Sequence, residues 1–264
     1  MLIVKKIVIF DDLKTKQMKE VPYFKELKNY AGMFKSACVV FDPAHGEDVA
    51  GKRSPDEKHR EYLWSRQRID GIVSVLDKAS NKGFDVLVPF KNHINEPGLT
   101  KRVDTYNQLC NNYDLVIMIS IHNDALKNPP EFWSGPGGFT FYTDRGETMA
   151  DTIVDFMGDI FKQSLPRERF RFDYGLGSGE TVKDKDREAN FTVIHGYGKT
   201  PKIVPAKYVG ILIENNFMDV KDDLHKLMSP DWNKELEFVY IDTIFQIFRE
   251  LRIINYINTV TVKP

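Results

Sequence analysis

The sequence predicts an α/β fold in which a single twisted, largely parallel sheet has helices on both faces. Apolar strands alternate with helical segments along most of the chain, and this order is typical of parallel sheets. The runs that end near Phe41, Ile121 and Ile213 are almost continuously apolar, which is the pattern of strands covered on both sides. With 264 residues, of which 42% are hydrophobic, the chain can bury a sizeable core.

Each expected element depends on a local pattern. Helices are expected where apolar residues recur at helical spacing, as at Ile69, Ile72 and Leu76. Strands are expected at short apolar runs between turn residues. In chain order the expected elements are a strand at 37–42, a loop at 43–60, a helix at about 61–80, a strand at 85–89, a helix near 100–112, a strand at 115–121, a loop at 127–138, a strand at 138–143, a helix at about 146–164, strands near 191–194 and at 207–213, and a helix at roughly 231–251.

Polar residues follow the three apolar runs. His45 lies at the C-terminal end of the first run, and His122 and Glu214 lie at the ends of the other two. In open α/β sheets, ligands bind beyond the carboxyl ends of the strands, so these three side chains can converge there. A fourth polar residue, Glu61, opens the first helical segment. Its simplest explanation is that a carboxylate in the first turn suits the helix dipole.

These residues lie in segments that resemble a known family. The segments are Asp42-Pro43-Ala44-His45-Gly46, Gly51 to Asp56 running into Arg60-Glu61-Tyr62, Ser120 to Ala125, and Ile213 to Asp219. In this order they are similar to the zinc-dependent N-acetylmuramoyl-L-alanine amidases, in particular the phage endolysin branch that cleaves bacterial peptidoglycan. The resemblance covers roughly residues 37 to 250.

The resemblance implies that His45, Glu61 and His122 are ligands of a Zn²⁺ cofactor and that Glu214 is the catalytic carboxylate. The residue types suit this division. A catalytic zinc takes three N or O ligands from the protein and leaves one position for water, whose pKa falls to about 7. A nearby carboxylate can then act as general base and later protonate the leaving amine. Bacterial peptidoglycan is the implied partner.

Some positions depart from the family pattern. Ala44 and Asn216 stand where glycine is usual, and Val220 stands where asparagine is frequent. Asparagine tolerates the left-handed backbone conformation better than most residues, so Asn216 can preserve a turn. Val220 removes a polar group and puts substrate contacts at that position in doubt.

The residues also allow simpler or different explanations. Each histidine alone is more often a turn or core residue than a ligand, and Glu47, Glu57 and His59 are alternatives to Glu61. A zinc peptidase or carboxypeptidase cutting elsewhere in the stem peptide is a second function, in which Arg53 or Arg187 faces a free carboxylate. A third is a virion component that binds peptidoglycan without catalysis.

Charge and cysteine content set limits on partners and redox state. The formal net charge of −1 creates no field that attracts nucleic acid, so no nucleic-acid partner is expected. No apolar run approaches the roughly 20 residues of a membrane span, so no membrane insertion is expected either. Cys38 and Cys110 are too few for a disulfide framework and are expected to be buried free thiols.

Three segments are expected along the chain: an N-terminal extension of unknown role at 1–36, a catalytic domain at 37–252 and a tail at 253–264. Near the start, Lys5 and Lys6 interrupt the apolar residues, which is unlike a secretory signal. The chain is therefore expected to be made in the cytoplasm without a signal peptide and to act on the bacterial cell wall, that of the host if a phage encodes it. The sequence leaves the oligomeric state open.

Overall fold

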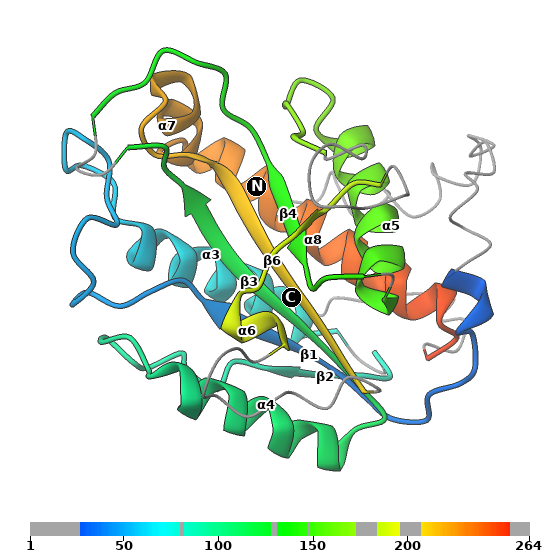
Figure 1. Ribbon diagram of the computed structural model, residues 1–264. Coiled ribbons are helices and arrows are strands. Elements are labelled where there is room, and N and C mark those ends of the chain that lie inside the picture. The colour runs from blue at the N-terminus through cyan, green and yellow to red at the C-terminus, as the bar shows by residue number, and fades with distance from the viewer. Residues whose placement is uncertain are drawn as a thin grey trace, which may run out of the picture.

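The computed structural model describes residues 27–79, 82–127, 131–146, 148–172, 184–195 and 207–253. These residues form a six-stranded sheet with the strand order β2-β1-β3-β6-β4-β5. The strands are β1 (Ala37–Pro43), β2 (Asp85–Leu87), β3 (Leu115–Asp124), β4 (Thr140–Thr143), β5 (Arg187–Glu188) and β6 (Tyr208–Phe217). Their direction turns progressively across the sheet (Figure 1), so the sheet is twisted.

Helices cover both faces of this sheet (Figure 1). On one face α3 (Glu61–Leu76) and α5 (Met149–Ser164) each pack against α8 (Pro230–Glu250). On the other face lie α4 (Leu99–Asn112) and the short α6 (Thr192–His195), which contact each other. Strands β2, β1, β3 and β6 are parallel, while β4 runs antiparallel to β6 and parallel to β5. The predicted α/β class with a largely parallel sheet is confirmed.

Strand β3 shows why the central strands are apolar at consecutive positions. Its residues Ile117 and Ile119 belong to the core under α3, α5 and α8. Val116 and Met118 belong to the core under α4 and α6. Because successive side chains of a strand point to opposite faces, a strand between two cores needs an apolar residue at every position. The second face turns polar only near the end of the strand, at Ser120.

The structure corrects the sequence prediction for five elements. The predicted strand at 191–194 is wrong, because Thr192–His195 form helix α6. A short apolar stretch has no periodicity that separates strand from helix, and here Val193 and Ile194 pack into the second core. Helix α7 (Lys221–Leu227) and strand β5 were not predicted. Strands β3 and β6 also continue past their predicted ends.

The described part of the N-terminal extension packs on the domain. Leu27 is fully buried in the core, and the backbone N–H of Gly32 donates to the carbonyl of Leu251 at 2.9 Å. Residues 1–26 of the extension and 254–264 of the tail lie outside the described residues. Cys38 and Cys110 are buried free thiols, as expected.

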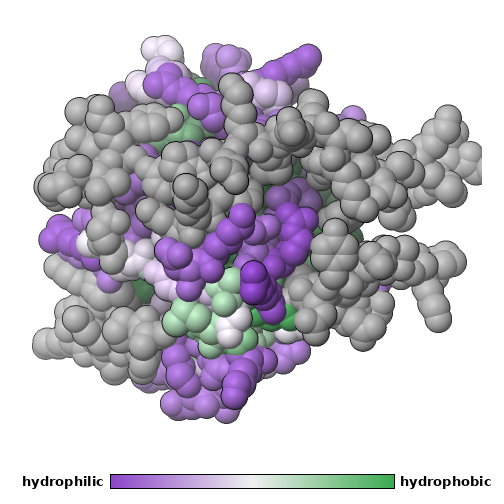
Figure 2. All heavy atoms as spheres, turned by 90° about the vertical axis from the view of Figure 1, so that its right-hand side faces the viewer, coloured by the Kyte–Doolittle hydropathy of each residue, from purple (hydrophilic) through white to green (hydrophobic). Residues whose placement is uncertain are grey.

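One face of the molecule combines hydrophilic and hydrophobic side chains among its described residues. Figure 2 shows purple side chains around a small hydrophobic area on the face that lies to the right in Figure 1. Among the described residues, no helix combines the length and the apolar character that crossing a membrane requires.

A buried acidic pair lies where β4 meets β5 and the start of α5. The hydroxyl of Thr143 contacts the carboxyl groups of both Asp151 and Asp186, but its one proton can satisfy only one of them. Burial raises the pKa of Asp186 to about 9; the Thr143 hydrogen bond opposes this rise, and the charges of Asp151 and Asp184 reinforce it. Asp186 is therefore protonated in the folded protein at neutral pH.

This protonation predicts how stability depends on pH. In the unfolded chain this carboxyl group is protonated only below a pH of about 4. Its contribution to the free energy of unfolding is therefore fully present below that pH, and it is lost as the pH rises toward the pKa of the folded protein. We expect Asp186→Asn, which cannot ionise, to become more stable relative to wild type by up to about 1.4 kcal/mol per pH unit between about pH 5 and about pH 8. Urea unfolding across this range measures the difference. The exposed Asp70→Asn variant is the control, and identical pH profiles for Asp186→Asn and wild type would contradict the prediction.

Candidate functional site

The predicted ligand residues come together at the carboxyl ends of the central strands. His45 follows β1, His122 lies in β3, and Glu61 is the first residue of α3. One ligand atom from each lies within 4.8 Å of the others, and this is the group among the described residues that could hold a metal ion. Glu61 is central to the group: its Oε1 is 2.9 Å from His122 Nδ1, and its Oε2 is 3.7 Å from His45 Nε2.

The Glu61 carboxylate is buried and has one open oxygen. Its Oε1 accepts a hydrogen bond from the backbone N–H of Asn123 at 3.1 Å, whereas its buried Oε2 has no hydrogen-bond partner. Burial opposes its ionisation, but the hydrogen bond and charge of His122 and the charge of His45 outweigh this and lower the pKa of Glu61. Burial lowers the pKa of His122, which favours the neutral imidazole. A neutral imidazole and an ionised carboxylate are the forms that bind metal.

The side chain of Arg66 holds the backbone of His45 in place. Its φ of 41° is unusual for a residue other than glycine. The Arg66 guanidinium donates to the carbonyls of His45 at 2.9 Å and Ala44 at 3.0 Å. The next residue must be glycine, because a Cβ on Gly46 would lie 2.0 Å from the backbone N of Glu96.

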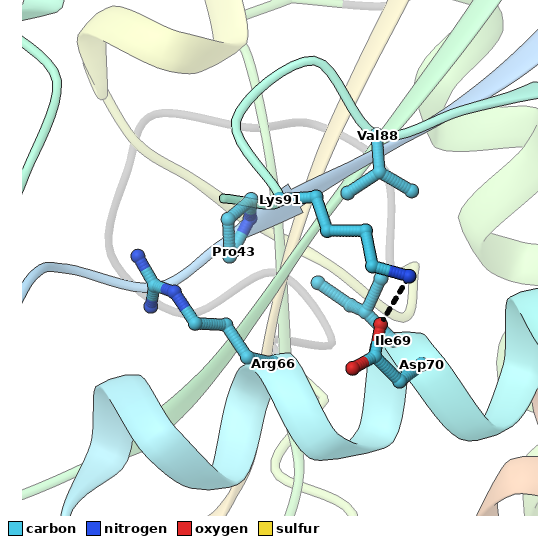
Figure 3. Close-up of a pocket in the computed structure, with 6 residues that line it drawn as sticks. All are labelled: Pro43, Arg66, Ile69, Asp70, Val88 and Lys91. Carbon is cyan, nitrogen blue, oxygen red and sulfur yellow. Dashed lines mark ion pairs between the residues drawn. The ribbon is translucent and has the colours of Figure 1, made fainter. Parts of the chain in front are cut away.

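The same arginine lines a pocket next to β1, which is distinct from the histidine group. Figure 3 shows Arg66 beside Pro43, with the ion pair between Lys91 and Asp70 on the opposite wall. The pocket encloses about 10 Å³, which is room for a single water molecule. We therefore interpret it as a packing feature that supports the His45 loop.

Helix α3 is tied to the ends of two strands. The Ser65 hydroxyl accepts a hydrogen bond from the backbone N–H of Ala44 at 3.0 Å and donates to the carbonyl of Ile121 at 2.6 Å. These two bonds join one helical turn to the strand ends that precede His45 and His122. They fix the first turn of the helix, and with it Glu61, against β1 and β3.

Glu214 lies beside His122 in the sheet. The two residues are register partners on β3 and β6, and Thr140 of β4 is the partner of Glu214 on its other side. The buried Oε2 of Glu214 has no hydrogen-bond partner. Burial, followed by the negative charges of Glu61 and Asp124, raises the pKa of Glu214 well above its usual range. The protonated form of this carboxyl group is therefore favoured relative to a carboxyl group in water.

A network of buried amides holds the ends of β3 and β6. The Asn123 side chain donates to the carbonyl of Asn215 at 2.8 Å and accepts from His59 Nε2 at 2.8 Å. The Asn215 amide donates to the carbonyl of His122 at 3.1 Å, and its Oδ1 accepts from the Tyr240 hydroxyl at 2.8 Å. His59, an alternative to Glu61 in the sequence, thus contacts this network and not the histidine group.

Asn216 continues β6 at the position where the family usually has glycine. Its φ is 64°, so the expected left-handed backbone is confirmed. Neither of its buried side-chain polar atoms has a hydrogen-bond partner.

The segment around Phe132 and Trp133 has a mixed role. The Trp133 backbone N–H donates to the carbonyl of Asp219 at 2.7 Å and its ring lies 6.4 Å from that of Phe217, so this residue ties the loop to the body. Phe132 is 39% exposed, with the Lys221 ammonium 5.3 Å from its ring. Val220 is buried beside Trp133 and offers no surface to a substrate.

Sequence reasoning missed two residues that contact the histidines. Ser120 Oγ lies 3.1 Å from His122 Nε2, and Glu96 Oε2 lies 3.5 Å from His45 Nδ1. The interaction with His45 lowers the pKa of Glu96. The alternation of a strand could have found Ser120, which is two positions before His122 and on the same face. No sequence pattern marks Glu96, which lies in a loop.

Comparison with known proteins shows the family. The model of the N-acetylmuramoyl-L-alanine amidase family, Amidase_3, matches residues 39–245. The chain belongs to this amidase family. Its members act as peptidoglycan amidases, so the enzyme class implied by the sequence resemblance is confirmed. All four predicted site residues lie inside the matched range. No curated protein sequence matches the chain significantly.

Solved amidase structures share this fold. The N-acetylmuramoyl-L-alanine amidase from Clostridium difficile 630 is 17% identical, with a TM-score of 0.62 over 81% of this chain and 98% of that chain. The catalytic domain of CwlV from Bacillus (Paenibacillus) polymyxa var. colistinus is 18% identical, with a TM-score of 0.58 over 81% and 98%. AmiC2 of Nostoc punctiforme is 17% identical, with a TM-score of 0.55 over the same shares. At these identities the similarity is one of fold.

The amide network of this amidase predicts the effect of removing one hydroxyl group. Tyr240→Phe leaves the buried Asn215 Oδ1 without its donor, and we expect the free energy of unfolding to fall by about 1–3 kcal/mol. Tyr113→Phe is the matched control, because the Tyr113 hydroxyl bonds Asp85 near solvent. Denaturant unfolding compares the two variants. If both variants lost the same free energy of unfolding, the buried hydrogen bond would stabilise the protein no more than the exposed one.

Proposed function

We propose that this protein is a zinc-dependent amidase that hydrolyses the bond between the lactyl group of N-acetylmuramic acid and the L-alanine of the stem peptide. The observation that carries the proposal is the convergence of His45, Glu61 and His122, each with one ligand atom within 4.8 Å of the others, beside the carboxyl group of Glu214. The donor set of two imidazoles and one carboxylate is typical of catalytic zinc. The open Oε2 of Glu61 supports it, because a buried oxygen without a partner is costly unless a cation binds there.

The three ligand residues divide the task of holding the ion. When bound, zinc lowers the pKa of water and polarises the carbonyl of the scissile amide. Glu61 supplies negative charge at the centre of the group, and the two histidines supply neutral nitrogen donors from either side. Because strand ends and a helix start hold these residues, the site is organised before a ligand arrives.

Glu214 moves the proton. The carboxylate of Glu214 accepts a proton from the attacking water as the new C–O bond forms. It then donates this proton to the amine nitrogen of L-alanine as the C–N bond breaks, so the carboxylate is regenerated. Its raised pKa supports the second step, because a carboxyl group that holds its proton more firmly than usual can carry that proton from the water to the leaving amine. A bound dication would offset the charge of Glu61 and bring this pKa down again.

The proposal predicts separate losses for the two kinds of residue. We expect Glu214→Gln to bind zinc as wild type does and to lose activity about a hundredfold or more, because only proton transfer is removed. His122→Ala is expected to lose both zinc and activity. Digests of purified peptidoglycan, analysed by mass spectrometry of the soluble products, measure activity, and metal analysis after dialysis measures binding. Chelator-treated wild type is the control.

The products also separate the alternative functions. Stem peptides that begin at L-alanine support the proposed bond. Shortened peptides still attached to muramic acid would instead indicate a peptidase. Sedimentation with the wall without any release would indicate a binding protein.

We further propose that the protein is a phage endolysin, made in the cytoplasm and acting on the host cell wall, on the basis of its sequence resemblance to that branch. Expression inside a susceptible bacterium is then expected to leave the cells intact until the inner membrane is permeabilised. Turbidity should fall after permeabilisation with wild type but not with Glu214→Gln. Lysis without permeabilisation would contradict this role.

A further inference from the structure

Each histidine of the site has a second polar residue near the ring nitrogen that faces away from Glu61. His122 presents Nδ1 to Glu61, and its Nε2 lies 3.1 Å from Ser120 Oγ. His45 presents Nε2 to Glu61, and its Nδ1 lies 3.5 Å from Glu96 Oε2. The nitrogen of each ring that faces away from Glu61 therefore has its own neighbour.

These two neighbours are joined through one buried ion pair. Asp42 is fully buried, and Arg102 is 2% exposed. The Arg102 guanidinium donates to Asp42 through Nε at 3.1 Å and Nη2 at 2.9 Å, and through Nη1 to Glu96 Oε1 at 3.3 Å. The Ser120 hydroxyl donates to Asp42 Oδ2 at 2.8 Å. A continuous chain of polar contacts thus runs from one histidine to the other through this pair.

The direction of the hydrogen bonds in this chain is determined by its carboxylates. A carboxylate paired with a guanidinium only accepts, so Asp42 requires Ser120 to be a donor. The oxygen of Ser120 then accepts from Nε2–H of His122, so Nδ1, which donates to Glu61 Oε1 at 2.9 Å, is the nitrogen that would give up its proton to bind a cation. Glu96 Oε2 lies 3.5 Å from His45 Nδ1 and makes no hydrogen bond to it in this geometry, but a carboxylate beside Nδ1 favours a proton on that nitrogen and leaves Nε2 free. This arrangement favours, in each ring, a proton on the nitrogen that faces away from Glu61 when a cation binds between the rings and Glu61.

We propose that the Asp42–Arg102 pair is a common positioning element that sets the ring orientation and tautomer of both His45 and His122, through Ser120 on one side and Glu96 on the other. The inference rests on the proposed zinc site. Arginine suits this position because its planar fork binds Asp42 with two nitrogens and still has a third for Glu96. A lysine cannot make these contacts together.

The experiment measures zinc affinity by competition with a chromogenic chelator in the full chain. Loss of a partner behind a metal-binding histidine typically weakens metal affinity about 10–100-fold. We expect Ser120→Ala to fall in this range and Glu96→Ala to show a smaller loss, because the contact of Glu96 with His45 is longer. Glu96→Gln keeps an acceptor oxygen and is expected to restore much of the affinity.

Matched controls remove the same groups elsewhere. Thr243→Val deletes a buried hydroxyl in α8 that has no hydrogen-bond partner, and Glu131→Ala deletes an exposed carboxylate. Both are expected to bind zinc as wild type does. Thermal melting of the metal-free variants reports any general loss of stability separately.

A second readout tests the tautomers directly. In zinc-loaded protein labelled with ¹⁵N-histidine, NMR is expected to place the ring proton of His122 on Nε2 and that of His45 on Nδ1. In Ser120→Ala we expect the His122 signal to shift toward a second form, while His45 stays unchanged. A residue that only supported the fold would lower stability without this selective change.

The common anchor predicts coupling between its parts. Arg102→Lys is expected to weaken zinc binding in wild type and to add less in the Glu96→Ala background, because the branch to His45 is already broken there while the branch through Ser120 remains. If Arg102→Lys does not fold, the Ser120 and Glu96 variants decide alone. Wild type that binds no zinc would overturn both the proposed function and this inference. Wild type that binds zinc, with Ser120→Ala and Glu96→Ala within about twofold of it and unchanged tautomers, would overturn the positioning role alone.

Discussion

The burial of the Glu61 carboxylate is the constraint on which the site depends. This side chain is 1% exposed, and a buried carboxylate is stable only where other groups compensate for lost water. The backbone N–H of Asn123 and the two imidazoles provide that compensation. Helix α3 must therefore begin where β1 and β3 end, and Ser65 holds it there with bonds to both strands.

Stability and chemistry are separated along the length of the strands. In β3 the first residues fill two apolar cores, and polar groups appear only from Ser120 onward. The apolar part of the strand stabilises the sheet. The polar part can therefore hold groups that lack hydrogen-bond partners in the fold itself. Glu61 and Glu214 each keep a buried oxygen without a partner at this end. Buried oxygens without a hydrogen-bond partner destabilise the fold, and they are the atoms that a ligand would contact.

Much of this arrangement could be predicted from the sequence. The apolar runs predict the central strands, and the rule that ligands bind beyond the carboxyl ends of parallel strands predicts that His45, His122 and Glu214 lie close together. Helix α6 could not be predicted, because four residues show no period. Glu96 and Arg102 could not be connected to His45 from sequence either. Their contacts depend on how a loop and α4 pack against β1, which no local pattern records.

The sequence by itself determined the fold class, the order of the central strands and long helices, and the residue types that reach the carboxyl edge of the sheet, because these follow from apolar periodicity. Only the tertiary structure decided which nitrogen of each histidine faces Glu61, that His45 has a left-handed backbone held by Arg66, and that Asp42 and Arg102 connect the two rings. The physical reason is that these features are side-chain contacts between segments distant in the chain. Such contacts are fixed by strand register and helix packing, which exist only in the folded protein.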